Sequence, residues 1–422
     1  MKLRKSVVLA TLFTMLFSFA FAATVVVAAG AVGDEFDLAK RNCDAWAAAT
    51  GNTVVMFQSP NLTNDRLGLF QQIFAAKSSE IDVVQIDVIW PGLLGSHFVD
   101  LYDYIPKSHA ALHFKPIVAN NTDSKGRLLA MPFFTDAGLL YYRKDLLDKY
   151  GKSAPATWEE LEATAKEILQ KENNPNLVGF VFQGKAYEGL TCNALEWIDS
   201  YGGGEIIDPN SGKITINNKK AKQALETIAG FIGTISPKGV LNYAEEDARG
   251  IFQSGNAIFM RNWPYAWTLS QGDGSPIKNK VGVVPLPKGG TKGKNTGTLG
   301  GWNMAVSKYS KNKKEAASLV QYLTTPQIQL QRAIDGSYNP TIDAVYDEPT
   351  IAAANPFMSQ LKSTFTNAVA RPSKLTGRDY NKVSSAFWNA VHAALSGEKT
   401  ADKALKDLEK NLKKINKGKS KW

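Results

Sequence analysis

The chain has 422 residues, 44% of them hydrophobic, which predicts more than one folded domain and enough apolar content for two cores. Its formal net charge of +10 belongs mostly to the two ends. Positions 2, 4 and 5 are basic, and the segment from Lys399 to the C-terminus holds nine lysines against three acidic residues. Residues 23–398 therefore carry only about +1. This balance argues against a nucleic-acid partner and is compatible with a neutral ligand.

The first 22 residues have the pattern of a secretory signal peptide. A basic region precedes an apolar run over residues 7–20, and Ala20-Phe21-Ala22 supplies the small-x-small motif of a cleavage site. The apolar run is too short to span a bilayer comfortably. We expect cleavage before Ala23 and a periplasmic location for the mature chain.

Strands and helices are predicted to alternate along the mature chain. The apolar patterns indicate a strand at 24–28, a helix at 34–50, a strand at 53–57, a helix at 64–76 and a strand at 81–86. This rhythm is typical of an α/β protein with a parallel sheet that helices cover on both faces.

The same alternation returns further along the chain, with a strand at 138–142, a helix at 157–170 and a strand at 177–183. Thr157 and Glu160 have the spacing of a capping box at a helix N-terminus. Beyond Pro349 the pattern is helical, and it ends in amphipathic helices over 379–395 and 400–415.

Residues that could carry metal, cofactor or nucleophile chemistry are few. Cys43 and Cys192 are the only cysteines, and we favour free thiols over a disulfide bond. His109 and His113 are four residues apart, but they lie in a Pro-flanked segment and are expected at the surface. No metal-binding motif, phosphate-binding glycine loop or nucleophile elbow occurs. We expect no cofactor and no metal.

Four segments carry a family resemblance, and a fifth follows them: GAVGDE at 30–35, DVVQIDVIWP at 82–91, MPFFTDAGLLYYRKDLL at 131–147, FQSGNAIFMRNWPYAW at 252–267, and GGWNMAVS at 300–307. In this order the chain resembles extracellular solute-binding proteins of ABC sugar importers in the maltose-binding family. It is most similar to the trehalose/maltose-binding receptors, over essentially the whole mature chain.

The resemblance implies a two-lobe periplasmic binding protein fold. Each lobe would be a sheet flanked by helices, and about three chain crossings would form a hinge. The first lobe would take residues 23–133 and 298–328, and the second 134–297 and 329–422. A disaccharide would bind between the lobes, and a monomeric receptor would deliver it to the membrane permease of an ABC importer.

A sugar presents hydroxyl groups around its rim and C–H patches on its faces. A receptor therefore needs aromatic faces, together with planar polar side chains that bond neighbouring hydroxyls. The resemblance implies that Trp263 and Trp302 stack on the sugar and that Phe134 lies beside them. Trp90 and Trp267 are expected in the cleft wall or the core.

Polar contacts to the ligand are also implied by the resemblance. Asp87, Asp136 and Arg66 are the main candidates, because an Asp at the carboxyl end of a strand or at a hinge crossing faces the opening between lobes.

Three further residues match cleft positions of the receptors: Glu35, Gly301 and Arg371. The neighbouring Asp34 leaves open which of the two acidic residues faces the cleft.

Two alternative functions remain at this point. A secreted glycoside hydrolase also has carboxylates in an aromatic cleft, but it needs a carboxyl pair at a defined separation, and no hydrolase signature occurs. We therefore expect a receptor rather than an enzyme. The same fold could instead bind an amino acid, a polyamine or a phosphate ester. The mixture of Arg, Asp and Trp fits a neutral polyhydroxyl ligand best. The sequence leaves open which disaccharide binds.

Overall fold

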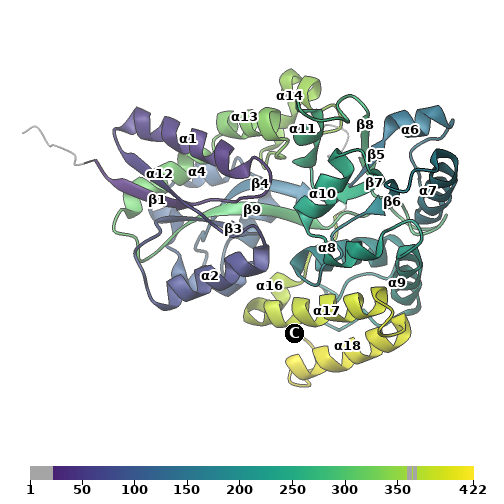
Figure 1. Ribbon diagram of the computed structural model, residues 1–422. Helices are drawn as coiled ribbons and strands as arrows, with labels where there is room; N and C mark the ends of the chain where they lie inside the picture. The colour runs from purple at the N-terminus through teal and green to yellow at the C-terminus, as the bar shows by residue number, and fades with distance from the viewer. Residues whose placement is uncertain (1–21, 359–363, 365–367) are drawn as a thin grey trace, which may run out of the picture.

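The computed structural model describes residues 22–358, 364 and 368–422. Residues 1–21, 359–363 and 365–367 lie outside this part, so all but the last residue of the predicted signal peptide is outside the described chain. Two mixed sheets, each flanked by helices, form two lobes side by side (Figure 1). No helix of the described part is long and apolar enough to cross a bilayer.

The first lobe is built on a five-stranded sheet with the order β2-β1-β3-β9-β4. Its strands are β1 (Thr24–Ala28), β2 (Thr53–Phe57), β3 (Val83–Asp87), β4 (Met131–Ala137) and β9 (Leu299–Val306). Val25 and Val27 pack on one face with helices α1 (Glu35–Thr50) and α12 (Lys313–Leu323). Ala28 faces the other side, where α2 (Thr63–Ala75) packs. The period-two alternation of the strand thus builds two cores on one sheet.

The second lobe has the strand order β6-β7-β5-β8. Its strands are β5 (Leu139–Arg143), β6 (Val178–Val181), β7 (Ala257–Asn262) and β8 (Val281–Pro285). One face carries helices α7 (Trp158–Glu172), α8 (Glu188–Ser200), α9 (Lys219–Phe231), α17 (Tyr380–Leu395) and α18 (Ala401–Ile415). The opposite face carries α10 (Glu245–Gln253) and α11 (Ala266–Gln271).

Shorter helices complete the two lobes. They are α3 (Pro91–Leu94), α4 (Lys107–Ala110), α5 (Lys115–Asn120), α6 (Lys144–Lys149), α13 (Pro326–Gly336), α14 (Pro349–Ala354) and α16 (Ser373–Thr376). Short 3-10 helices span Gly95–His97, Leu101–Asp103, Lys238–Asn242, Asp343–Asp347 and Gly377–Asp379.

The predicted helices and strands are confirmed, with ends that shift by one or two residues. At the start of α7 the Thr157 hydroxyl accepts a hydrogen bond from the Glu160 N–H at 3.1 Å. The Glu160 carboxylate accepts one from the Ala156 N–H at 2.8 Å. The predicted N-cap at Thr157 is therefore confirmed, but the reciprocal contact of a capping box is absent among the described residues, because the Glu160 carboxylate bonds the N–H of Ala156 rather than that of Thr157.

The prediction of a parallel sheet is wrong in part. β1 runs parallel to β2 and β3, but β9 lies antiparallel between β3 and β4. In the second sheet only β6 and β7 are parallel. The reason is that β9 enters the first sheet on its return from the second lobe. Local hydrophobic patterns predict a strand but carry no information on its direction.

The chain passes between the two sheets at Gly138, which separates β4 from β5, and again over residues 286–298, which separate β8 from β9. It passes a third time before α17, which packs on α8 and α9. The boundary predicted after residue 133 falls inside β4, which pairs with β9 as far as Ala137. The lobe boundaries otherwise remain predictions.

The structure also shows the surroundings of the two cysteines and of two of the histidines. Cys43 and Cys192 are both buried and free, so the preferred alternative of unpaired thiols is confirmed. His109 and His113 were expected at the surface but are buried. His109 hydrogen-bonds Thr324, and His113 hydrogen-bonds Thr341. Burial lowers the pKa of His113 to about 3. The prediction failed because both partners lie more than 200 residues further along the chain.

Candidate functional site

A cavity of about 60 Å³ lies between the lobes, and domain interfaces are where ligand pockets preferentially occur. Strands β3, β4 and β9 supply residues from the first lobe, and α8, α10 and the segment after β7 supply residues from the second. Every predicted site residue except Arg66 lines this cavity, namely Glu35, Asp87, Phe134, Asp136, Trp263, Gly301, Trp302 and Arg371. The fold thus gathers residues that are up to 336 positions apart, from Glu35 to Arg371, around one space.

Helix N-termini from both lobes meet at the cavity. Glu35, Glu188 and Glu245 are the first residues of α1, α8 and α10, and Thr63 is the first residue of α2. The N-terminus of a helix carries a partial positive charge and free N–H groups. These ends therefore moderate the repulsion between carboxylates that crowd into one cleft.

Glu35 rather than Asp34 faces the cavity, since Glu35 is buried and Asp34 is exposed. Gln85 Nε2 donates to Glu35 Oε1 at 2.5 Å, and the Gly30 N–H donates to Gln85 Oε1 at 2.9 Å. A Cβ atom on Gly30 would lie 1.7 Å from Glu35 Oε2. Glycine at this position is therefore what lets the carboxylate fold against the backbone of the preceding loop.

Asp136 differs from the other cleft carboxylates because it has no hydrogen-bond partner among the described residues, although its side chain is buried. Burial, followed by the nearby charge of Glu35, raises the pKa of Asp136 to about 8. Arg261 and Arg332 act in the opposite direction. A buried polar group without a partner is costly, so a ligand that bonds Asp136 would recover that cost.

The two predicted stacking residues come from different lobes. Trp302 lies in β9 of the first sheet, and Trp263 directly follows β7 of the second. The guanidinium carbon of Arg261 is 3.9 Å from the centroid of the Trp263 ring. The corresponding carbon of Arg66 is 4.6 Å from the Trp302 ring, which also meets Trp90 edge-on at 5.5 Å. Both half-buried rings are therefore held by cation–π contact while they border the cavity.

Arg66 is placed differently from the expectation of a cleft residue. It is fully buried, does not line the cavity, and lies against Trp302. Its Nε donates to the Pro60 carbonyl at 3.1 Å. Burial lowers its pKa, which Glu35, Asp87 and Glu245 oppose. In this structure Arg66 supports a stacking residue from behind.

Gly301 lines the cavity and lies in β9. Its φ of +125° belongs to a region that residues with a side chain rarely adopt. A Cβ atom there would lie 2.5 Å from the Phe134 carbonyl oxygen. The glycine is thus required for the close pairing of β9 with β4.

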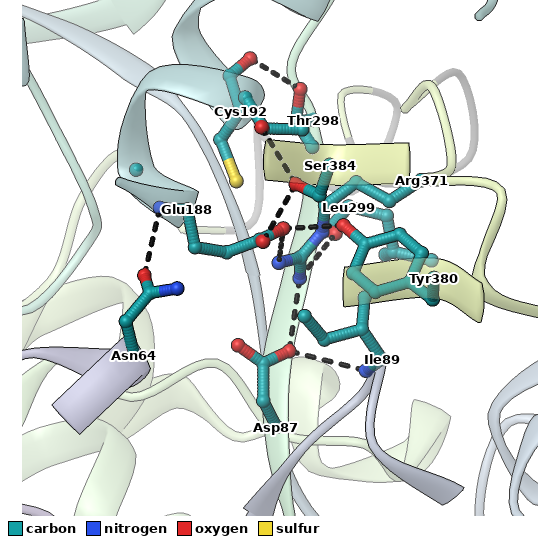
Figure 2. A network of polar contacts seen from close by, with 12 residues as sticks. Asn64, Asp87, Ile89, Glu188, Cys192, Thr298, Leu299, Arg371, Tyr380 and Ser384 are labelled. Atoms are coloured by element: carbon teal, nitrogen blue, oxygen red, sulfur yellow. Dashed lines mark hydrogen bonds and ion pairs between the residues drawn. The ribbon is translucent and has the colours of Figure 1, made fainter. Parts of the chain in front are cut away.

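Arg371 joins the two lobes through ion pairs (Figure 2). It donates to Asp87, at the end of β3, and to Glu188, at the start of α8, at 3.0 Å each. Glu188 also accepts hydrogen bonds from Tyr380 and Ser384. Burial raises the pKa of Glu188, and Arg371 opposes that shift. The network links the first sheet to helices of the second lobe.

A second contact between the lobes lies beside this network. Asn64 Oδ1, in α2, accepts a hydrogen bond from the Glu188 N–H at 3.0 Å (Figure 2). The free N–H at the start of α8 is therefore capped by a side chain from the other lobe.

The sequence analysis did not identify several cavity residues, among them Glu188, Glu245, Tyr265 and Tyr338. Glu188 and Glu245 are the first residues of α8 and α10, two helices that the sequence analysis did not predict. Tyr338 follows α13, and its ring centroid lies 4.8 Å from that of Phe134. The Tyr338 hydroxyl makes no hydrogen bond within the described part of the chain. Tyr338 can therefore offer a hydroxyl group to a ligand, which the neighbouring Phe134 cannot.

The chemistry of the site is that of polar recognition between aromatic walls. Carboxylates, the guanidinium group of Arg371 and the side chains of Tyr265 and Tyr338 surround the same space as two tryptophans. Among the described residues no group of three or more His, Cys, Asp or Glu side chains is arranged to hold a metal ion.

Known proteins with similar sequences and structures are solute-binding proteins. A family model described as bacterial extracellular solute-binding protein matches residues 33–330. A probable ABC transporter-binding protein of Deinococcus radiodurans is 54% identical over 399 residues, 94% of each chain.

Two solved structures extend this comparison. The maltose-bound MalE3 of T. maritima superimposes with a TM-score of 0.88 at 41% identity, over 93% of this chain and 100% of the other. A solute-binding protein of Agrobacterium vitis with bound D-mannitol has a TM-score of 0.80 at 21% identity, over 94% and 99% of the two chains. At that identity the likeness concerns the fold alone.

Proposed function

The chain belongs to the family of bacterial extracellular solute-binding proteins, and from this premise we propose that it captures a disaccharide of the trehalose/maltose type between its lobes. It would then deliver the sugar to the permease of an ABC importer. The family works as the binding component of such importers and not as an enzyme.

The observation that carries the proposal is that aromatic and polar groups from both lobes border one cavity. Trp302 and Trp263 border the cavity from opposite lobes, and the buried carboxyl group of Asp136 has no hydrogen-bond partner among the described residues. The C–H faces of a sugar ring pack on aromatic rings, and its hydroxyl groups bond carboxylates that would otherwise stay unpaired. A disaccharide offers two such rings.

A neutral ligand fits the charges of the site. Among the described residues five carboxyl groups line the cavity, and Arg371, the helix N-termini and the raised pKa of Asp136 offset them only in part, so an anionic ligand is disfavoured. A phosphate ester would need a cluster of basic groups, but Arg371 is the only Arg or Lys among the lining residues and is already paired with Asp87 and Glu188. The related T. maritima protein with bound maltose supports a disaccharide.

Titration calorimetry of the purified mature protein with a panel of sugars tests the proposal. We expect trehalose or maltose to bind more tightly than glucose, maltotriose and D-mannitol at equal ionic strength. Asp136→Asn is the matched variant that tests the contact of the sugar with this carboxyl group, because it retains the size of the side chain and removes the unpaired carboxylate. Tight binding of mannitol or of a monosaccharide, with no response to the two disaccharides, would overturn the proposed ligand class.

The alternative of a glycoside hydrolase is tested by incubating the protein with trehalose and maltose. A receptor returns both sugars intact, as chromatography would show. Reproducible release of glucose, lost in Asp136→Asn, would instead assign the cleft carboxylates to hydrolysis.

Location and assembly follow from the same proposal. We expect the chain in the periplasmic fraction after removal of its first 22 residues. Mass spectrometry of the exported protein would give an N-terminus at Ala23, and size-exclusion chromatography with light scattering would give a monomer.

A further inference from the structure

Arg332, in α13, is a buried cation without a hydrogen-bond partner. It is 1% exposed, and none of its three side-chain nitrogens has a partner within the described part of the chain. Arg261 is equally buried, yet it donates to both oxygens of Glu196 and to Gln183. Burying an uncompensated charge is strongly unfavourable, whereas an apolar side chain of similar volume would be tolerated. The position of Arg332 therefore needs another explanation.

Three aromatic rings surround this guanidinium. Its central carbon lies 3.7 Å from the ring centroid of Phe133, 4.7 Å from that of Tyr338 and 5.4 Å from that of Phe134. Cation–π attraction is strongest where water is excluded, as it is here. The rings therefore replace part of the stabilisation that hydrogen bonds would supply.

A bulge in β4 brings two consecutive rings to the same side. The pairing of β4 with β9 shifts between Pro132 and Phe134, so Phe133 is the extra residue. Neighbouring residues of a regular strand point to opposite faces, but Phe133 and Phe134 both belong to the core that contains Tyr338. Bulges commonly re-aim side chains beside binding sites.

Two of the three rings on Arg332 are also part of the wall of the ligand cavity. Phe134 and Tyr338 line it, and their centroids are 4.8 Å apart. Arg332 itself does not line the cavity, so these two rings separate the guanidinium from the ligand space. Burial lowers the pKa of Arg332, while Tyr338, Glu35 and Asp136 are among the groups that oppose this. The cation thus faces two carboxylates of the cavity.

We propose that Arg332 is a positioning residue for ligand binding, which holds the rings of Phe134 and Tyr338 in the cleft wall and places a positive charge behind Asp136. It would raise the affinity for sugar without touching the ligand, at a cost in stability. The proposal rests on the proposed sugar-binding function.

Three variants test this proposal by calorimetry, with trehalose and maltose as ligands. Arg332→Met retains most of the side-chain volume without the charge. It should leave the melting temperature unchanged or raise it, while the affinity for sugar falls at least about tenfold. Arg332→Lys retains the charge without the planar group and should bind with intermediate affinity. Arg261→Met is the matched contrast. It should lower the melting temperature, because it leaves the buried carboxylate of Glu196 without its cation.

Two results would overturn the proposal. One is wild-type affinity in Arg332→Met. The other is a loss of stability as large as that of Arg261→Met, or a failure to fold, because either would show that Arg332 serves the fold alone.

A sugar-free measurement separates this inference from the proposed function. Carbon NMR of carboxyl groups, with Asp136→Asn to assign the signal, gives the titration midpoint of Asp136. The other charged groups that face Asp136 are Glu35, Asp87 and Arg261, and they are the same in both proteins. In Arg332→Met the midpoint should move to higher pH. If the wild type binds no sugar and the midpoint moves, only the proposed function fails; an unmoved midpoint overturns the role of Arg332.

Discussion

The side chains of the cleft are held by neighbours that do not themselves border the ligand space. Arg66 lies behind Trp302, Arg261 against Trp263, and Arg332 behind Phe134. Aromatic rings are flat, and a guanidinium group is flat as well, so the two stack closely. Each ring that would contact the sugar is therefore fixed before the ligand arrives, which reduces the entropy lost on binding.

At this scale we first predict the effect of removing a stacking ring. Trp263→Ala or Trp302→Ala should weaken sugar binding by about 1–3 kcal/mol, since a large apolar contact is lost. Titration calorimetry measures this effect, and thermal unfolding shows whether the variant is folded. Trp267→Ala is the control, because Trp267 packs on Phe357 outside the cavity lining. Normal binding by a folded Trp263→Ala protein would assign that ring to the core.

A second prediction concerns pH and Asp136. Its pKa of about 8 in the folded state is far above the ordinary value of 3.8, so the folded protein retains a proton that the unfolded chain releases. Stability from this group therefore falls as the pH rises from about 4 to about 8. Asp136→Asn lacks this titration. It should be more stable than the wild type at pH 8 by at least about 1.4 kcal/mol, the value of one pKa unit.

Calorimetric melting of both proteins between pH 4 and pH 9 checks this. The two stabilities should converge towards pH 4, where Asp136 is protonated in the wild type in both states. A constant difference across the range would mean that Asp136 does not titrate with a raised pKa.

At the scale of helices, the cleft is a meeting point of N-termini. α1, α8 and α10 each begin with a glutamate that lines the cavity, and α2 begins there with Thr63. α1, α2 and α8 each follow a strand and therefore begin at the carboxyl edge of a sheet, whereas α10 follows a 3-10 helix and precedes β7. The resulting positive potential is a property of the backbone, which no single side-chain substitution removes.

A helix of the second lobe allows a direct test of a predicted cap. Thr157→Ala removes the acceptor for the Glu160 N–H at the start of α7 and should lower the free energy of unfolding by about 0.5–2 kcal/mol. Thr164→Ala, in the same helix and without a capping position, is the matched control. It should be neutral or slightly stabilising, because alanine favours helix more than threonine does. Urea unfolding measures both, and equal losses would contradict a capping role.

For the whole molecule, the contacts between the lobes matter most. Arg371 pairs with Asp87 of the first sheet and with Glu188 of α8, and Asn64 caps α8 from the other lobe. These contacts form only when the lobes approach each other. A sugar that touches both walls has the same requirement, so it binds the closed form better and shifts the population towards it.

We therefore predict that saturating sugar reduces the radius of gyration in small-angle scattering. A sugar that does not bind, at equal concentration, controls for the effect of osmolyte. In Arg371→Met the sugar-free radius should be larger than in the wild type, because the ion pairs between the lobes are absent. An unchanged radius of the wild type at saturation would mean that the ligand contacts one lobe only.

Much of the fold was predictable from the sequence, because its signals are local. Apolar periodicity and capping residues within a few positions of each other determine where a strand or helix begins and ends. The helix at 34–50 and the cap at Thr157 were predicted in this way and are confirmed. The candidate site came from motif resemblance, which names positions such as Asp136 and Trp263 but gives no contacts for them.

Only the tertiary structure decided what depends on distant partners. The antiparallel direction of β9, the burial of His109 and the position of Arg66 behind Trp302 all require residues from other parts of the chain. The pairs of Arg371 with Asp87 and Glu188 join positions 284 and 183 residues apart. Such contacts arise from the packing of whole lobes, and the local pattern around each residue contains no trace of them. The unpartnered charge of Arg332 is likewise visible only once the rings around it have been placed.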